Sequence, residues 1–313
     1  MTRKRLTQVF PFLLPLRRWQ RKKFFYYKMQ KDGCLYAKKT ADNLFPNLVF
    51  EASIPMLNEK SGFDVKYQIN KIHNLKLAAR TINHVVIRPD ETFSFWQLVR
   101  WADRQEKYKD GLNLVNGKIV AAYGGGLCML SDMLFWMFLH TPLTIVERHG
   151  HAVKSFPETT EALAAGMVAT EMIAAGMSAA ETLPAGTDAA VVEGWLDLKV
   201  RNDTDNTFQI ELDFDDKYMY GRILSKEDVG ITYSVFNCSV SYKRQDGRIY
   251  QTAAVCRTET DRKSGRQRKT ELYVNKCEIA YRLPADIKIE EDIKVVRESK
   301  ISRMRKEKDH GNE

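Results

Sequence analysis

The first 31 residues contain no aspartate or glutamate, although 40 acidic residues occur in the chain as a whole. This segment carries ten lysines and arginines, whereas the complete chain of 313 residues has a net charge of only +9. Residues 32–313 are therefore almost neutral, with 39 basic and 40 acidic side chains. A neutral body excludes a basic nucleic-acid-binding surface, so we expect no nucleic-acid partner and treat the basic segment as an N-terminal arm.

Long hydrophobic runs are also absent from this arm. Its apolar stretch, Val9 to Leu16, has eight residues and two prolines, whereas a membrane-spanning helix needs about 20 apolar residues. The stretch is short for a signal-peptide core, and no small-residue cleavage site follows it. Two alternatives stay open: the arm packs on the body through Phe12, Leu13 and Trp19, or it lies on an anionic lipid surface. We therefore predict a cytoplasmic protein, either free or peripheral on the inner face of the membrane.

The chain lacks paired cysteines of the CxxC type. Its five cysteines are odd in number and widely spaced, at positions 34, 128, 238, 256 and 277. This pattern is typical of neither a zinc ribbon nor a disulfide scaffold. We expect reduced thiols, no structural metal and no cofactor.

Hydrophobic periodicity predicts two helices and a hairpin in the first half of the chain. In residues 70–84, Ile72, Leu75, Ala79 and Ile82 share one helical face. Asn116–Gly117 lies between two short apolar runs and predicts a β-hairpin over residues 112–121. Residues 127–139 are apolar almost all round, which predicts a buried helix that ends before Thr141–Pro142.

From residue 189 the pattern changes to the alternation typical of strands. The expected fold class is α+β, with a buried cysteine-bearing helix packed on an antiparallel sheet and a β-rich C-terminal region. The expected divisions are a basic arm at 1–31, a main domain at 32–205 with an insertion at about 160–183, the β-rich region at 206–283 and a charged tail at 284–313. The insertion is marked by the tetrad AAGM, which occurs twice in an alanine- and methionine-rich stretch.

Cys128 is the first candidate functional residue, because three glycines precede it and the predicted buried helix begins beside it. The start of a helix offers unpaired N–H groups and the positive end of the helix dipole, both of which favour a thiolate. The same N–H groups, with the backbone of Gly125 and Gly126, could stabilise an oxyanion on an acyl substrate. Two alternatives stay open: a core cysteine, or a phosphate-binding turn, although the GK[ST] signature is missing.

Histidines follow this helix in a segment that we predict to be a strand. His149 and His151 are two residues apart, so on a strand both would face the same side and either could reach Cys128. Asp188, Glu193 and Asp197 follow and could orient an imidazole. The order of cysteine, histidine and carboxylate is that of papain-like and transglutaminase-like enzymes, by analogy of arrangement only. Zinc bound by His149, His151 and Cys128 is a further alternative.

Four segments together resemble the VanW family: DETFSFWQLVRWADRQEKYKDGL, GGGLC, LHTPLTIVERHGHAV and PAGTDAAVVEGWLDLKVRNDT. The resemblance implies a link to glycopeptide (vancomycin) resistance and cell-wall metabolism. Some family members resemble cysteine-dependent L,D-transpeptidases, which cross-link peptidoglycan peptides. Carried over by motif, the nucleophile is Cys128, the arginine and histidine are Arg148 and His151, and the aspartate is Asp188. The family commonly has glutamine after the cysteine, where this chain has Met129.

The leading hypothesis is thiol acyl transfer on peptidoglycan peptides or their precursors. In it Cys128 attacks, His151 or His149 is the base, and Asp188 orients the base. Gly125, Gly126 and Arg148 would contact the substrate. The alternative is a non-catalytic accessory protein that binds a cell-wall precursor or a resistance enzyme through the glycine turn.

Overall fold

The computed structural model describes residues 10–57, 63–115, 118–154, 183–283, 285 and 287–291. Its helical segments are η1 (Pro11–Leu13), α2 (Leu14–Lys31), α3 (Val65–Ile82), α4 (Phe95–Val99) and α5 (Leu127–Leu139). The strands of the first half are β1 (Leu35–Tyr36), β2 (Asn47–Pro55), β3 (Val86–Ile87), β4 (Glu91–Ser94), β5 (Asp110–Val115), β6 (Lys118–Tyr123), β7 (Thr144–Glu147) and β8 (Val153–Lys154). Those of the second half are β9 (Lys199–Arg201), β10 (Phe208–Phe214), β11 (Tyr218–Ser225), β12 (Ile231–Gln245), β13 (Arg248–Asp261), β14 (Gln267–Ile279) and β15 (Ile289–Glu290).

Helix α5 packs on an antiparallel sheet, which confirms the expected α+β class. The sheet has the strand order β2-β11-β10-β3, and α5 contacts its strands β2 and β11. Gly221 on β11 makes this contact close, because a Cβ built there would lie 2.7 Å from the sulfur of Met137. Ten of the thirteen residues of α5 are buried, so this helix is the centre of the hydrophobic core.

Helix α3 packs against β5 and α5, and its residues Lys71 and Asn74 contact the glycine turn that precedes α5. The predicted apolar face is confirmed: Leu75, Ala79 and Ile82 are buried and Ile72 is partly buried. Asp64 caps the helix by accepting a hydrogen bond from the N–H of Lys66. The same face also carries the buried polar residue Asn74.

Two small sheets complete the lower layer. One has the strand order β1-β4-β9-β7. In it β9, which begins after residue 198, pairs with β7, the strand that follows α5. The other is the hairpin β5–β6, in which Val115 pairs with Lys118. This pairing confirms the predicted hairpin, although Asn116–Gly117 itself lies outside the described residues.

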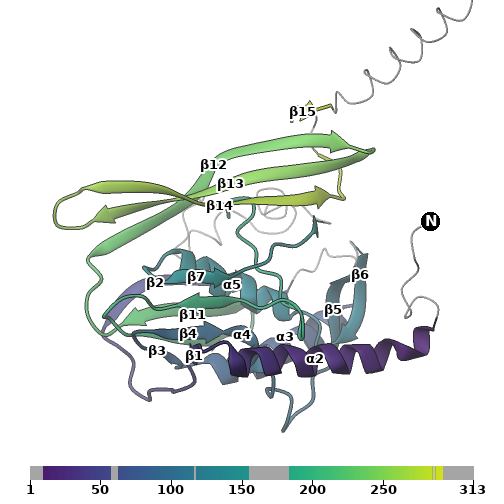
Figure 1. Cartoon of the computed structure of the whole chain (residues 1–313), viewed down its shortest axis with the longest axis horizontal. Helices are drawn as coiled ribbons and strands as arrows, with labels where there is room; N and C mark the ends of the chain where they lie inside the picture. The colour runs from purple at the N-terminus through teal and green to yellow at the C-terminus, as the bar shows by residue number, and fades with distance from the viewer. Residues whose placement is uncertain are drawn as a thin grey trace, which may run out of the picture.

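A long twisted sheet forms a second layer over the first, as Figure 1 shows. Its strand order is β15-β12-β13-β14-β8. β12 and β13 form a hairpin with a bulge between Asn237 and Ser239, and strand β8 joins the edge beside β14. The expectation of alternating strands in the C-terminal half is confirmed. The AAGM insertion and most of the charged tail lie outside the described residues.

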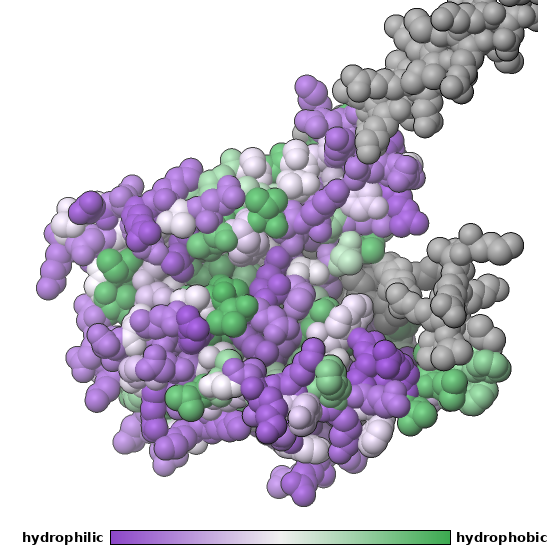
Figure 2. All heavy atoms as spheres, viewed as in Figure 1, coloured by the Kyte–Doolittle hydropathy of each residue, from purple (hydrophilic) through white to green (hydrophobic). Residues whose placement is uncertain are grey.

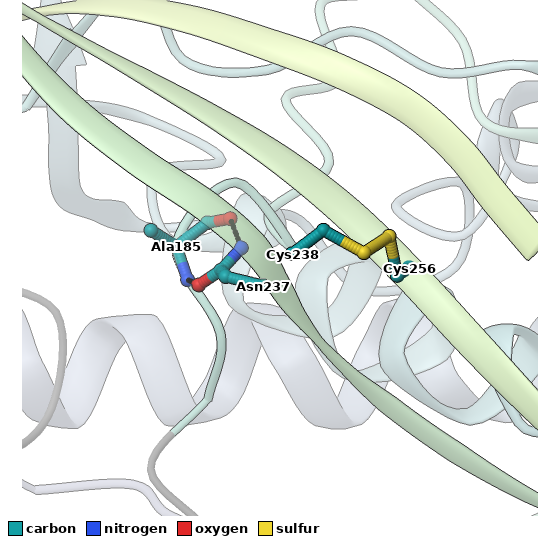
Figure 3. The surroundings of a disulfide bond; sticks show 4 residues. All are labelled: Ala185, Asn237, Cys238 and Cys256. Carbon is teal, nitrogen blue, oxygen red and sulfur yellow. Dashed lines mark hydrogen bonds between the residues drawn. A yellow bond between two sulfur atoms is a disulfide. The ribbon is translucent and has the colours of Figure 1, made fainter. Parts of the chain in front are cut away.

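The expectation that every cysteine is a free thiol was wrong. Cys238 and Cys256 form a disulfide across the β12–β13 hairpin, and Cys34, Cys128 and Cys277 are free. The register shifts between Asn237 and Ser239, and Figure 3 shows the disulfide that joins the two strands next to Asn237. Sequence spacing gave no warning, because the pairing depends on the register of a hairpin that joins residues 18 apart.

From Pro11 to Lys31 the N-terminal arm is helical, and it packs on the body through residues other than those expected. Phe12 is 75% exposed and Trp19 is 57% exposed, so packing through these two rings was a wrong expectation. Phe25 and Tyr26 pack against the core instead, and Met29 is buried. Among the described residues, no helix is both long and apolar enough to cross a membrane.

We predict that the buried side chain of Asn74 stabilises the glycine turn. Its amide donates to the carbonyls of Lys109 and Gly125 at 2.9 and 3.0 Å, and its oxygen accepts from the N–H of Lys109 at 2.8 Å. Asn74→Ala leaves these buried groups unpaired, so we expect the free energy of unfolding to fall by about 2–4 kcal/mol in urea titrations. Asn70→Ala removes one exposed hydrogen bond and should cost less than about 1 kcal/mol. Equal losses in the two variants would contradict this role.

Candidate functional site

Cys128 is the second residue of α5, directly after a turn formed by Gly124, Gly125 and Gly126. Gly126 is the N-cap with φ +101°, a conformation that favours glycine. Gly125 lies so close to Gly111 on β5 that a Cβ at position 125 would be 2.3 Å from the Gly111 oxygen. Glycine is therefore required for the β5–β6 hairpin to hold the start of α5, and with it Cys128, in place.

The segment 187–191 lies along the first two turns of α5. The Cys128 thiol is 3.8 Å from the carbonyl of Val191, and the Ser131 hydroxyl donates to the carbonyl of Ala189 at 2.6 Å. The N–H of Ala189 donates to the Asp132 carboxylate at 2.7 Å. These contacts bring Asp188, which is 60 positions after Cys128, to the start of the helix.

Asp188 joins the two charged side chains predicted from the motifs. One carboxylate oxygen accepts from the backbone N–H of His151 at 2.6 Å and pairs with its Nδ1 at 2.7 Å. The other accepts from Arg148 at 2.9 Å. Burial would raise the pKa of Asp188, but the hydrogen bond to His151 and the charge of Arg148 hold it well below its usual range.

Arg148 is held by protein groups on all sides. It donates to the carbonyls of Gly186 and Asp188, both at 2.6 Å, and to the side chain of Asn275 at 2.8 Å. The guanidinium also lies over the rings of Phe135 and Tyr273, at 5.4 and 4.9 Å from their centroids. With its side chain 9% exposed, this geometry favours a positioning role over the expected contact with substrate.

His151 lies between Asp188 and Cys128. Burial would lower the pKa of His151, but hydrogen bonds to Asp188 and Cys128 and the charge of Asp132 raise it well above 6.5. With Nδ1 held by Asp188, Nε2 is the ring nitrogen left for the sulfur. The structure therefore brings Cys128, His151 and Asp188 together in the order that the sequence suggested.

His149 points to a different carboxylate. Strand β7 ends at Glu147, so the two histidines are in a loop and the expectation that both share one strand face was wrong. The His149 ring pairs with Glu147 at 3.1 Å. The predicted zinc ligands His149, His151 and Cys128 do not form a set, and within the described ranges no group of three or more His, Cys, Asp or Glu side chains is arranged to hold a metal ion.

Asp132 was missed in the sequence, although it is the only acidic residue of α5. It lies four residues after Cys128 and therefore on the same face of the helix. Burial raises its pKa to about 7, aided by Asp188 and opposed by His151 and Arg148. A single carboxylate in an otherwise apolar helix, one turn from the candidate nucleophile, was the signal that could have identified it.

Two asparagines of the long sheet hold parts of this site in place. Asn275 on β14 accepts from Arg148. Asn237 at the bulge of β12 accepts from the N–H of Ala185 at 2.7 Å and donates to its carbonyl at 2.9 Å, as Figure 3 shows. The turn at 184–188, which carries Asp188, is thus attached to the long sheet. Neither asparagine could be recognised in the sequence, because each is far from the motifs along the chain.

Each segment that resembled the VanW family contributes at least one residue described above. Two comparisons with known proteins test this resemblance. Residues 70–224 match the family model described as VanW like protein. The chain is 46% identical to the vancomycin B-type resistance protein VanW of Enterococcus faecalis, over 93% of this chain and 99% of the relative. The chain belongs to the VanW family.

A second comparison covers a shorter part of the chain. The chain is 33% identical to the uncharacterized protein YoaR of Bacillus subtilis over 113 residues, which are 35% of this chain and 37% of the relative. No solved structure matches the chain.

Replacing Asp188 should change the titration of His151. In Asp188→Asn the ring loses its anionic partner, so we expect its pKa to fall toward 6.5, measured by NMR titration of histidine-labelled protein. Glu147→Gln, which alters the partner of His149 instead, should leave the His151 titration unchanged. An unaltered His151 in Asp188→Asn would contradict the pairing.

The same pair predicts a pH dependence of stability. Asp188 stabilises the fold above its unfolded pKa of about 3.8, and this contribution is lost as pH falls through its lowered folded pKa. His151 stabilises fully below its unfolded pKa of about 6.5, and this contribution is lost as pH rises through its raised folded pKa. Urea unfolding of the parent and Asp188→Asn should therefore differ most between about pH 4 and 6.5.

Proposed function

We propose that this protein transfers acyl groups through a thioester on Cys128, with peptidoglycan peptides or their precursors as substrates. The observation that carries the proposal is the continuous arrangement of Cys128, His151 and Asp188 at the start of α5. A cationic imidazole beside a thiol favours the thiolate, which is the nucleophilic form. The substrate class is the one that the resemblance to the VanW family implies, and the chain is similar to a vancomycin B-type resistance protein of Enterococcus faecalis.

The proposed reaction has two steps. In the first, the Cys128 sulfur attacks an amide carbonyl, the C–S bond forms, the C–N bond breaks, and the leaving amine takes a proton from His151. In the second, the amine of an acceptor attacks the thioester, gives a proton to His151 and releases the thiolate. Asp188 keeps the ring oriented in both steps, and Arg148 keeps Asp188 in place.

Backbone N–H groups would stabilise the oxyanion of each tetrahedral intermediate. The N–H groups of Leu127 and Cys128 precede the first i−4 hydrogen bond of α5, so they are free of helical partners. The side chain of Met129 packs against the core and offers no hydrogen-bond donor. Stabilisation at this position would therefore depend on the helix start and the glycine turn.

The disulfide bears on where the reaction would occur. A bond between Cys238 and Cys256 supports an oxidising compartment, against the cytoplasmic location expected from the sequence. Peptidoglycan is cross-linked outside the membrane, so an external location agrees with the proposed substrate.

Trapping an acyl-enzyme tests the proposal. Incubation with a stem-type peptide should add the mass of the acyl group to the protein, seen in intact-mass spectra and mapped to Cys128. Cys128→Ala should abolish the adduct, whereas Cys34→Ala, which removes an exposed thiol, should retain it. Iodoacetamide should label Cys128 faster than Cys34 at pH 6 to 7.

The accessory alternative predicts a different result. If no peptide acylates the protein, and Cys128→Ala leaves resistance unchanged in a resistant host, then the protein binds a precursor or a resistance enzyme without catalysis.

A further inference from the structure

Two polar side chains, buried Lys71 and half-buried Tyr108, lie against the glycine turn that precedes Cys128. Lys71 on α3 is only 9% exposed, and a Cβ built on Gly126 would lie 2.2 Å from its Cγ and 3.0 Å from its Cδ. The ring of Tyr108 lies at the other end of the turn, 3.4 Å from the position of a Cβ on Gly124. Both side chains therefore pack on the turn that leads into α5.

Neither polar group has a partner in the part of the chain that the structure describes. The Tyr108 hydroxyl is buried and makes no hydrogen bond there. Burial lowers the pKa of Lys71 to about 8, and no carboxylate acts against this effect. The ammonium is still mostly protonated at pH 7, so a buried charge remains without a counter-ion, which destabilises a fold unless a ligand uses it.

The first turn of α5 adds a third element. Gly126 is its N-cap and Met129 is the first residue to donate back to that cap, at 3.0 Å. The N–H groups before Met129 have no helical partner, and the positive end of the helix dipole lies at this end of α5. Both features stabilise an anion. Lys71 and the helix start thus provide positive charge from two separate elements.

We propose that Lys71 and Tyr108, beside the start of α5, bind a free carboxylate of the substrate peptide. This inference rests on the proposed function, because it names the group of the substrate peptide that the protein would recognise next to the bond that is cleaved. The Lys71 ammonium, on its long rotatable stem, forms an ion pair with the carboxylate, and the Tyr108 hydroxyl donates to it. The site would select peptides with a carboxylate over the same peptides with an amide.

The test measures binding without turnover. The full chain with Cys128→Ala is titrated calorimetrically with a stem-type peptide that has a free C-terminal carboxylate, and with its C-terminal amide. The carboxylate peptide should bind at least about tenfold more tightly at pH 7. This preference should decline as pH rises through the Lys71 pKa of about 8.

Lys71→Met keeps the unbranched stem of the side chain and removes the charge. It should abolish the preference for the carboxylate, and its melting temperature should equal or exceed that of the parent, because an uncompensated buried charge is lost. Tyr108→Phe should weaken the preference and stay folded. Lys66→Met, which alters an exposed lysine on the same helix, should retain it.

The outcomes separate this inference from the proposed function. A carboxylate preference in the parent that disappears in Lys71→Met supports the inference even if no acyl-enzyme is ever trapped. Equal binding of the two peptides, an unchanged preference in Lys71→Met, or no binding of either peptide overturns it, even if Cys128 is acylated.

A separate surface supports a second inference. The outward face of α2 and η1 carries exposed apolar side chains at helical spacing: Phe12, Leu16, Trp19 and Tyr27, which are 75, 52, 57 and 55% exposed. Lys23 lies within this stripe, over the Trp19 ring at 5.8 Å. The opposite face, with Phe25 and Met29, packs on the body, so the stripe is not needed for folding.

The positive charge of α2 indicates which kind of surface the apolar stripe would bind. The helix has seven lysines and arginines and no acidic residue. It lies along one edge of the molecule, and green hydrophobic side chains gather at the end where the described chain begins (Figures 1 and 2). We infer that α2 binds an anionic lipid bilayer, with the aromatic stripe in the interface and the basic residues at the headgroups.

Flotation with lipid vesicles tests this surface. The full chain should float with phosphatidylglycerol vesicles in low salt, and should stay in solution with phosphatidylcholine vesicles or in high salt. Phe12→Ser combined with Trp19→Ser should reduce flotation by about tenfold or more. Trp101→Ser, at a tryptophan that is also 57% exposed, should have no effect. Flotation that is unchanged in the double variant, or a dimer formed through α2 without vesicles, would contradict the inference.

Discussion

The buried carboxylate of Asp188 is the group on which the geometry of the site depends. Both of its oxygens are used, one by His151 and the other by Arg148. An anion at this position is stable only because two cations and a backbone N–H surround it. The orientation of the His151 ring toward Cys128 follows from this arrangement, and so does the course of the turn at 184–188.

Contacts from α5 and from the long sheet hold this carboxylate in place. Helix α5 supports the segment beside it through Ser131 and Asp132. The long sheet holds the preceding turn through Asn237, and Arg148 through Asn275. The site is therefore formed between the lower layer and the long sheet, so movement of either layer would change the distance between sulfur and imidazole. The disulfide lies beside Asn237, which links the stability of that sheet to the candidate site.

The glycine turn has a complementary role. Close backbone contact between Gly111 and Gly125, and the buried amide of Asn74, fix the start of α5 without side chains on the turn. The turn therefore carries no side chain at the start of α5, where the N–H groups of Leu127 and Cys128 have no helical partners. Lys71 approaches the turn from α3, so the charges around Cys128 come from elements that are distant along the chain.

Much of the candidate site could be predicted from local sequence. The apolar run at 127–139 determined a buried helix, and the three glycines before it determined the abrupt turn that places Cys128 at its start. The order of a cysteine, a histidine and a carboxylate was also readable, whereas the choice of His151 and Asp188 came from the resemblance to the VanW family. The strand periods after residue 189 similarly determined a β-rich second half.

Tertiary structure decided which of these groups meet. His151 rather than His149 faces the thiol, because β7 ends early and the two rings turn to different carboxylates. Arg148 is enclosed between aromatic rings, Asp132 joins the charged cluster, and Cys238 pairs with Cys256 across a bulged hairpin. Each of these contacts depends on the register and packing of segments far apart in the chain, and local periodicity carries no information about such distances.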